Sequence, residues 1–326
     1  MAVYTRLGAE ELGAIVAEFD VGELVTAKGI AEGVSNSNWL IETRSDADRT
    51  QRFILTMYEG RTEVGDLPFF LGLLDHLAAR DCPVPRTIHD REDRKFREHE
   101  GKALALIEFL PGVSVSAPTP AQARAVGAAL ARVHLAAADF PMERPNSMGL
   151  AAWQSLLGAC GPEGLRDIDP GLADLVDREL AAVGRDWPAD LPRSVIHADL
   201  FPDNVLMLGD TVRGLIDFYF ACTDITAFDV AVTHAAWCFG DSGRDFDPDI
   251  SRSLLEGYGT VRTLSQSERE ALPLLGRAAS LRFLATRAYD WMNTPPDALV
   301  TPKDPMAFAR RLEFYADPRH AGIFET

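Results

Sequence analysis

The stretch at residues 195–208, VIHADLFPDNVLML, constrains the fold of this chain more than any other. Two short apolar runs flank a polar loop there, and a third apolar run, residues 212–216, ends abruptly at Asp217. Short apolar runs bounded by turn-forming residues are typical of β-strands. The pattern therefore predicts hairpin strands that present two carboxylates and one amide, those of Asp199, Asp217 and Asn204, at a common edge.

The order of these polar residues indicates phosphoryl transfer. The loop reads His-x-Asp-x-x-x-x-Asn and the next strand ends in Asp-Phe, which is the arrangement that kinases use. An attacking hydroxyl needs a carboxylate that orients it and accepts its proton, and Asp199 is the candidate for this catalytic role. Mg²⁺ prefers oxygen ligands, so Asn204 and Asp217 are the candidate metal ligands, while His197 is expected to hold the loop backbone. A solvated turn with incidental acidic residues is the alternative, but the full spacing between apolar strands argues against it.

Length, composition and charge restrict the class of protein. With 326 residues the chain is long enough for two lobes, and 47% hydrophobic and 25% charged residues are ordinary for a globular protein. A net charge of −17 argues against nucleic acid or an anionic membrane as the main partner, because both bind basic surfaces. The four cysteines lack a Cys-x-x-Cys pair, which predicts free thiols in a reducing compartment. We find no secretory signal pattern and no long uncharged apolar run, so we expect a soluble cytoplasmic protein.

The first 110 residues predict a strand-rich lobe. Residues 29–38 combine two glycines with four small polar residues, a composition that lets backbone amides approach phosphate oxygens, although an ordinary hairpin loop would look similar. The charged residues 90–101 are most simply a solvated hairpin tip, to which we assign no function. The expected helices lie at residues 9–18 and 65–79, and the expected strands at residues 21–28, 39–43, 53–57, 86–89 and 102–109.

The remaining residues predict a mostly helical lobe. Thr119, Pro120 and Gln122 form a capping box that begins a helix running to about residue 137. Within that helix His134 is expected to be a packed residue rather than a catalyst. Residues 139–169 look rich in loops, and further helices are expected at residues 171–183, around residues 230–237, and from a second capping box at Ser265 to residue 291. The expected domains are therefore a nucleotide-binding lobe at residues 1–110, a connector at 111–118, and a catalytic and substrate-binding lobe at 119–326.

With these residues in hand, the chain resembles the small-molecule kinases of the aminoglycoside phosphotransferase and choline kinase superfamily. Residues 197–204, HADLFPDN, match the His-Gly-Asp-x-x-x-x-Asn loop of that superfamily, with Ala198 in place of the usual glycine. Within it the chain is similar to the homoserine kinase branch, over essentially its whole length. This resemblance implies an α+β, bilobal, protein-kinase-like fold with an antiparallel-sheet N-lobe and a mostly helical C-lobe. The stretches that carry the likeness to the branch are residues 29–33, 66–71, 215–223 and 289–295.

One departure from the kinase pattern concerns the lysine that usually holds the nucleotide phosphates, paired with a helix glutamate. Thr56 stands at the lysine position and Phe70 at the glutamate position. Loss of both partners is coherent, because loss of one alone would leave a buried charge unpaired. Lys28 and Arg52, on neighbouring strands, are the candidates for a substitute cation. Mg²⁺ and the amides of residues 29–38 would then carry more of the phosphate charge.

The resemblance also implies where the nucleotide binds. The backbone near Glu108 and Leu110, at the connector between the lobes, would hydrogen-bond the edge of the adenine base. The phosphates would be held by the glycine-containing loop. The candidate residues of that loop are Gly33, Ser35, Asn36 and Asn38.

For the acceptor, the resemblance implies a site on the second lobe. Homoserine carries a carboxylate, which a guanidinium fork suits, so Arg282 and Arg287 are candidates, with ordinary helix-surface arginines as the alternative. Tyr219 and Asp224 follow the metal-ligand candidate closely enough to reach the acceptor. Asp229 is expected to tie down the loop backbone.

The resemblance therefore implies an enzyme that phosphorylates the side-chain hydroxyl of L-homoserine, giving O-phospho-L-homoserine for threonine biosynthesis. ATP and Mg²⁺ would be its cofactors. Two alternatives stay open. A kinase of another small alcohol, such as choline, ethanolamine or an aminoglycoside, would suit the acidic charge, and a non-catalytic nucleotide-binding module would suit the missing lysine. A protein kinase fits less well, because no segment ending in Ala-Pro-Glu follows the strand that ends in Asp-Phe.

Overall fold

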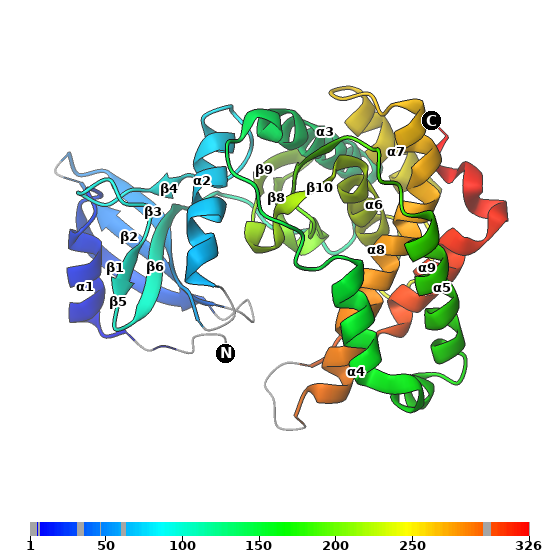
Figure 1. Cartoon of the computed structure of the whole chain (residues 1–326). Helices are drawn as coiled ribbons and strands as arrows, with labels where there is room; N and C mark the ends of the chain where they lie inside the picture. Colours follow the sequence, from blue (N-terminus) through cyan, green and yellow to red (C-terminus); the bar gives the residue numbers. More distant parts are fainter. Residues whose placement is uncertain are drawn as a thin grey trace. The chain divides into compact units, whose positions relative to one another are not determined.

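The structure is a computed structural model that describes residue 5 and residues 7–30, 36–45, 47–59, 63–295 and 301–325. The chain forms two compact units, Met1–Pro111 and Gly112–Thr326 (Figure 1). Each unit has its own antiparallel strands and its own helices.

An antiparallel sheet forms the centre of the first unit. Its strands run in the order β1-β2-β3-β6-β4, and β5 pairs with the beginning of β6. The expected strands are present, and β5 is an additional strand within the charged segment 90–101. The elements are α1 (Ala9–Ala17), β1 (Glu23–Ile30), β2 (Ser37–Arg44), β3 (Thr50–Met57), η1 (Val64–Asp66), α2 (Leu67–Ala78), β4 (Thr87–Ile88), β5 (Arg97–His99) and β6 (Lys102–Glu108).

Two helices cover the two faces of this sheet. Opposed residues in an antiparallel pair point to the same face. The register therefore places Trp39, Leu55 and Leu106 on one face, where they pack against the apolar side of α1. On the other face the Thr87 hydroxyl donates to the backbone oxygen of Leu71 in α2, at 3.2 Å. The two helices accordingly lie on opposite sides of the sheet (Figure 1).

The charged segment 90–101 differs from the solvated hairpin tip that the sequence predicted. The Asp90 side chain is 0% exposed, and its carboxylate accepts hydrogen bonds from Arg94 Nε at 2.9 Å and Arg97 Nη1 at 2.7 Å. The backbone amides of Glu92 and Arg94 also donate to it, each at 2.9 Å. Burial alone would raise the pKa of Asp90, but these donors outweigh it and hold that pKa well below its ordinary value of 3.8.

The second unit is mostly helical, and two short strand pairs carry the motif. β7 (Arg193–Ile196) pairs with β10 (Cys222–Ile225), and β8 (Val205–Leu208) pairs with β9 (Thr211–Leu215). The two strands that flank the polar loop, β7 and β8, thus belong to different pairs, and the expected hairpin consists of β8 and β9. The helices are α3 (Pro120–Ala136), α4 (Leu150–Ile168), α5 (Leu172–Asp186), α6 (Thr226–Trp237), α7 (Pro248–Gly259), α8 (Gln266–Asn293) and α9 (Met306–Ala316), with 3-10 segments η2 (Ala137–Asp139), η3 (Pro202–Asn204), η4 (Phe218–Phe220) and η5 (Pro318–Phe324).

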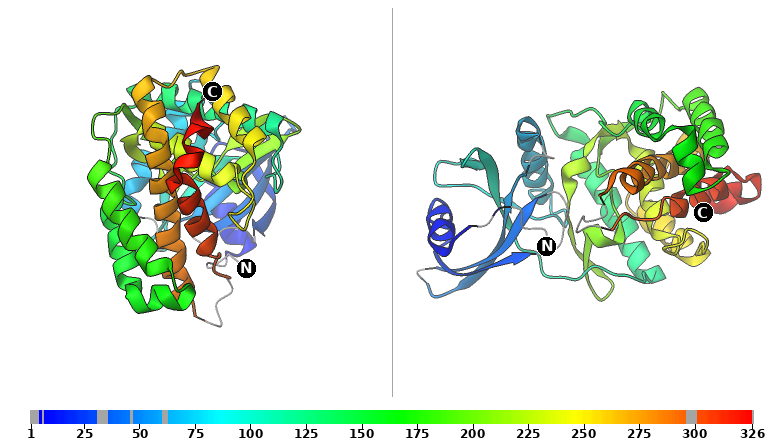
Figure 2. Two further views of the ribbon diagram at one scale, coloured as in Figure 1. Left: turned by 90° about the vertical axis from the view of Figure 1, so that its right-hand side faces the viewer. Right: turned by 90° about the horizontal axis from the view of Figure 1, so that it is seen from below.

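Side-chain caps determine where two of these helices begin. The Thr119 hydroxyl accepts from the amide of Gln122 at the start of α3, and the Ser265 hydroxyl accepts from the amide of Glu268 at the start of α8. Both predicted capping boxes are confirmed. α8 is 28 residues long and packs against α4, α5, α6 and α9 (Figures 1 and 2). It is the central helix of the second unit.

The expectation of a loop-rich segment at residues 139–169 is wrong for its second half, which α4 occupies. Gly161 has φ 68°, a left-handed conformation, and Pro162 follows it. These two helix-breaking residues interrupt α4 and conceal its apolar pattern in the sequence.

The cysteines agree with the expectation of free thiols. All four cysteines are free thiols, and all four are buried. Among the described residues no helix is both long and apolar enough to span a bilayer.

The Asp90 cluster gives a first testable prediction. Asp90→Asn should lower the free energy of unfolding of the first unit by about 2 kcal/mol at pH 7, because it removes the charge-assisted hydrogen bonds from Arg94 and Arg97 to a buried carboxylate. A carboxylate with a depressed pKa stabilises the fold above the ordinary pKa and loses this effect as the pH falls below it. Urea denaturation should therefore show a deficit that is full at neutral pH and shrinks below the ordinary aspartate pKa of 3.8.

Asp20→Asn is the matched control, because the Asp20 side chain is 89% exposed and lies 3.5 Å from Arg91 in a surface ion pair. Its effect should stay below about 0.5 kcal/mol at every pH. An Asp90→Asn variant that is as stable as the parent at pH 7 would contradict this interpretation.

Candidate active site

The loop between β7 and β8 brings Asp199 and Asn204 into direct contact. The Asn204 Nδ2 group donates to the Asp199 backbone oxygen at 2.8 Å and to its Oδ2 at 3.3 Å. The Asp199 side chain is 19% exposed, so it is enclosed but accessible. Because the amide nitrogen is engaged with Asp199, the Asn204 amide oxygen is left to face a ligand.

Asp217 lies at the end of β9 and is tied to the same loop. Its backbone has φ 66° and ψ 56°, a left-handed conformation that costs a residue with a side chain about 1 kcal/mol. Neighbouring hydrogen bonds hold it there. The Ile216 amide donates to the Asn204 backbone oxygen at 3.0 Å, and His197 Nε2 donates to the Ile216 backbone oxygen at 3.0 Å. His197 therefore serves the backbone of two segments and is itself fully buried.

The electrostatics of the two carboxylates are typical of a cation site. Burial raises the pKa of Asp199 to about 7; the nearby Asp217 carboxylate adds to this, against the opposite effect of Arg282. Burial also raises the pKa of Asp217. Two acids and an amide oxygen that are held together in this way form a hard-oxygen donor set of the kind that Mg²⁺ prefers.

Asp229, near the start of α6, holds the beginning of the loop. Its two carboxylate oxygens accept the amides of His197 and Ala198, each at 2.7 Å, and His134 Nε2 lies 3.0 Å from Oδ2. Burial would raise the pKa of Asp229, but the hydrogen bond and charge of His134 outweigh it and lower that pKa. On its other side His134 Nδ1 lies 2.8 Å from the Tyr258 hydroxyl. His134 is thus a packed residue, as expected, and it also buttresses the loop.

Arg282, in the middle of α8, holds the same loop from the other side. Its Nη1 donates to the Ala198 backbone oxygen, and its Nη2 lies 4.0 Å from Asp199 Oδ1. The side chain is 2% exposed, and its guanidinium carbon lies 5.4 Å from the Phe220 ring and 4.7 Å from the Phe283 ring. Arg282, which the sequence suggests for an acceptor carboxylate, is thus engaged with the backbone of the loop, while its Nε is buried without a hydrogen-bond partner among the described residues.

Ala198 occupies the strained centre of this arrangement. Its φ of 64° is left-handed, which explains why related kinase loops have glycine at this position. Asp229 binds its amide and Arg282 binds its carbonyl, so both polar groups of the strained residue are engaged.

The other acceptor candidates have different environments. The Asp224 carboxylate accepts from Asn146 Nδ2 at 2.7 Å and from the amide of Ile225 at 2.8 Å, and it lies 3.4 Å from Arg193. It therefore links three segments of the second unit. Tyr219 contributes its backbone amide, which bonds the Asp217 carboxylate. Arg287 is half-buried on α8.

In the first unit, the predicted phosphate loop is described only in part. Gly33 and Ser35 lie outside the described residues. Asn36 is buried, and its Oδ1 accepts the amide of Glu59 at 3.3 Å. The Thr56 hydroxyl donates to Asn38 Oδ1 at 2.8 Å. The position expected for a lysine thus holds a neutral hydrogen bond.

The two candidate substitute cations lie on the same face of the sheet but differ in their ion-pair partners. It places both Lys28 and Arg52 on the face of the sheet that carries Thr56. Arg52 is paired with Glu42 at 3.1 Å. Lys28 forms no ion pair with any residue that the structure describes.

The strand that leads to the connector offers one unused donor. The Glu108 amide donates to the Arg86 backbone oxygen at 2.9 Å, and the Glu108 carboxylate accepts the Arg86 amide at 3.2 Å. The Leu110 amide has no hydrogen-bond partner among the described residues. It is available to the edge of a base.

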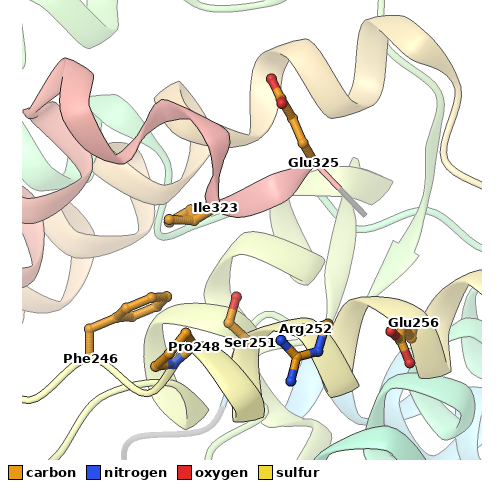
Figure 3. Close-up of a pocket in the computed structure, with 7 residues that line it drawn as sticks. All are labelled: Phe246, Pro248, Ser251, Arg252, Glu256, Ile323 and Glu325. Carbon is orange, nitrogen blue, oxygen red and sulfur yellow. The ribbon is translucent and has the colours of Figure 1, made fainter.

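A surface pocket of about 430 Å³ lies away from these residues, between α7 and the C-terminal segment (Figure 3). Two of its charged residues are already paired, Arg252 with Asp249 and Glu256 with Arg124. It includes none of the candidate site residues. Its lining consists of Phe246, Pro248, Ser251, Arg252, Glu256, Ile323 and Glu325.

Sequence reasoning missed the structural roles of His134, Tyr258 and Arg282 in this site. Each acts on the loop from far along the chain: Arg282 is 84 residues from Ala198, and His134 is 95 residues from Asp229. No local pattern identifies such contacts. A local sign was the occurrence of a histidine and an arginine between apolar neighbours, in VHL at residues 133–135 and LRF at residues 281–283.

Comparison with known proteins places this geometry in context. A family model described as the phosphotransferase enzyme family matches residues 26–275. A homoserine kinase from Azorhizobium caulinodans is 49% identical over 315 residues, which cover 97% of this chain and 96% of that protein. A homoserine kinase from Brucella anthropi is 48% identical over 318 residues, covering 97% of this chain and 94% of that one.

Solved structures share the fold at low identity. A spectinomycin phosphotransferase in complex with ADP and spectinomycin has a TM-score of 0.69 at 14% identity, covering 98% of each chain. An amicoumacin kinase, in complex with AMP-PNP, Ca²⁺ and Ami, also has a TM-score of 0.69, at 12% identity, covering 95% of this chain and 94% of that one. The expected protein-kinase-like α+β fold is thereby confirmed.

The strained loop generates a stability prediction. Ala198→Gly should raise the free energy of unfolding by about 0.5 kcal/mol, because glycine adopts the left-handed conformation without the penalty of a side chain, which outweighs its larger loss of backbone entropy. Chemical denaturation measures the change.

Ala181→Gly, at an exposed position in α5, is the matched control and should lower the free energy of unfolding by about 1 kcal/mol. If both substitutions destabilise the chain equally, the Ala198 position is not strained.

Proposed function

This chain belongs to the phosphotransferase enzyme family and, within it, to the homoserine kinases, and we infer that it transfers the terminal phosphate of ATP to the side-chain hydroxyl of L-homoserine. The product is O-phospho-L-homoserine. The observation that carries this conclusion is the identity of 49% to a homoserine kinase over 97% of this chain. The Asp199, Asn204 and Asp217 cluster supplies the chemistry that such a reaction needs.

Asp199 is the proposed catalytic residue. Its carboxylate orients the acceptor hydroxyl and accepts its proton as the bond to phosphorus forms. The pKa of about 7 that burial gives Asp199 suits a proton acceptor near neutral pH. The Arg282 guanidinium, 4.0 Å away, favours the ionised form that must receive the proton.

Mg²⁺ is the proposed metal, and the donor set fits it. Asn204 would provide its amide oxygen and Asp217 its carboxylate, and the bound ion would neutralise charge on the transferred phosphate. Asn204 is oriented by its bond to Asp199, and Asp217 by the Tyr219 amide. These bonds orient the two side chains that would hold the ion.

For the nucleotide, the proposed contacts come from the first unit. The Leu110 amide and the neighbouring backbone of Glu108 would bond the adenine edge. Asn36 and Asn38, at the beginning of β2, would hold the backbone beside the phosphate loop. Lys28 would supply the positive charge that Thr56 lacks.

The role of Asp199 has a direct test. Asp199→Asn should lower kcat at least about 1,000-fold while ATP binding stays within twofold, because the amide orients the hydroxyl poorly and cannot take its proton. Steady-state kinetics and calorimetric titration with ATP measure the two quantities. Asp210→Asn, in the exposed turn between β8 and β9, is the control and should leave both unchanged. Near-normal turnover by Asp199→Asn would remove this residue from the mechanism.

The acceptor has a separate test. A coupled ADP-release assay should detect turnover with L-homoserine and a phosphorylated product of the matching mass, at a kcat/KM at least about 100-fold above that for choline, ethanolamine or kanamycin. Preference for one of these amines would favour the alternative small-alcohol kinase. ATP binding without turnover of any acceptor would favour a non-catalytic module, the reading motivated by the neutral Thr56–Asn38 bond.

A further inference from the structure

Two arginines on adjacent helices share one aromatic ring. The guanidinium carbon of Arg287, in α8, lies 4.5 Å from the centroid of the Phe308 ring, and that of Arg311, in α9, lies 4.3 Å from it. α8 and α9 run side by side in the second unit (Figure 1). Two guanidinium groups therefore contact the same phenyl ring.

Neither guanidinium group has an anionic partner among the described residues. Arg287 Nη1 donates to the Asp304 backbone oxygen at 3.1 Å, and Arg311 Nη2 donates to the Gly240 backbone oxygen at 3.0 Å. Arg311 is 4% exposed, yet its Nε is buried without a hydrogen-bond partner. A guanidinium carries five N–H donors, so most of the donors of this pair remain unused.

This arrangement is costly without a ligand. Burial, together with the like charge of Arg311, lowers the pKa of Arg287 to about 10, and burial lowers the pKa of Arg311. The chain carries 49 acidic and only 32 basic side chains, so carboxylates to neutralise the pair are abundant in the sequence. Buried charges are normally paired, and a pair of cations without a directly bonded carboxylate among the described residues suits an external anion.

The pair lies beside the catalytic loop. The Phe308 ring is 6.2 Å from the ring of Phe201, two residues after Asp199, and 5.0 Å from the ring of Phe283. Just before α9, Lys303 Nζ is 3.8 Å from the Asp203 carboxylate of the same loop. The arginine pair thus packs, through Phe308, beside the loop that carries Asp199.

We propose that Arg287 and Arg311, which both pack on Phe308 and have no carboxylate within hydrogen-bond distance among the described residues, bind the α-carboxylate of the acceptor amino acid and so make the kinase specific for an amino acid. The proposal rests on the proposed function and adds its specificity determinant. A planar guanidinium fork matches a carboxylate in a bidentate geometry, which a lone amino alcohol cannot provide.

A neighbouring carboxylate can receive the other charge of the acceptor. Asp241 follows Gly240, is exposed, and makes no hydrogen bond with any described residue. Its charge acts on both Arg287 and Arg311, so it lies close to the pair. The ammonium group of an α-amino acid would face Asp241 while its carboxylate faces the arginines.

The test compares two acceptors that differ only in the carboxylate. L-homoserine and 3-amino-1-propanol share the hydroxyl and the amine, but the second lacks the carboxylate. Arg287→Gln should raise the KM and the calorimetric Kd for L-homoserine at least about tenfold. It should leave kcat/KM for 3-amino-1-propanol and the KM for ATP within twofold, so that discrimination between the two acceptors falls. Arg287→Lys should restore part of the loss, because the charge remains but the fork does not.

Two further variants protect the test against a folding defect. Arg269→Gln, at an exposed position in the first turns of α8, is the matched control and should change none of these quantities. Asp241→Asn, in an exposed loop, should weaken L-homoserine binding without changing thermal stability. An Arg287→Gln variant that binds L-homoserine as the parent does, that loses both acceptors equally, or that changes the KM for ATP instead, would overturn the proposal.

Failure of the proposed function would be visible separately, as a parent enzyme that neither binds nor phosphorylates L-homoserine. In that event the arginine pair is tested by calorimetry with L-serine, L-threonine and L-aspartate against their decarboxylated amines. Carboxylate-dependent binding that Arg287→Gln abolishes would support the pair, and absence of such binding to all three amino acids would overturn it.

Discussion

The catalytic loop depends on two buried charges that hold its backbone from opposite sides. The Asp229 carboxylate receives the amides of His197 and Ala198 at 2.7 Å, and the Arg282 guanidinium donates to the carbonyl of Ala198. Between them they fix a left-handed residue that carries a side chain, which costs about 1 kcal/mol by itself. Asp199 follows directly, so its carboxylate inherits a fixed direction. The charges of Asp229 and Arg282 thus fix the backbone of Ala198, and this backbone fixes the position of Asp199.

The same logic of paired and unpaired charge distinguishes support from function in this acidic chain. Asp229 and Asp90 are enclosed, but donors surround them and their pKa values are lowered. Asp199 and Asp217 are also buried, and burial raises their pKa values. Groups of the first kind stabilise the fold, whereas groups of the second kind are stabilised only when a ligand of opposite charge arrives. Arg287 and Arg311 are the cationic counterpart of the second kind.

The sequence predicts those features that depend on neighbouring residues. The strands around the loop, the two capping boxes and the order of Asp199, Asn204 and Asp217 all follow from short patterns. It does not predict that β7 pairs with β10 across 26 or more residues, or that Arg282 reaches the loop from α8, because such contacts depend on how the helices pack. The same limit applies to the acceptor candidates, because the sequence does not show that Arg282 donates to the backbone oxygen of Ala198. A break in the apolar pattern hid α4, since Gly161 and Pro162 lie inside it.

The central claim is that the loop held by Asp229 and Arg282 makes Asn204 and Asp217 converge on one divalent cation. The most direct measurement is anomalous scattering from crystals grown with Mn²⁺ and a non-hydrolysable ATP analogue. The expected result is an anomalous peak about 2.1 Å from both the Asn204 amide oxygen and an Asp217 carboxylate oxygen, in contact with the phosphates. A peak at the exposed Glu11, His99 and Glu100 cluster instead, with none between Asn204 and Asp217, would contradict the account.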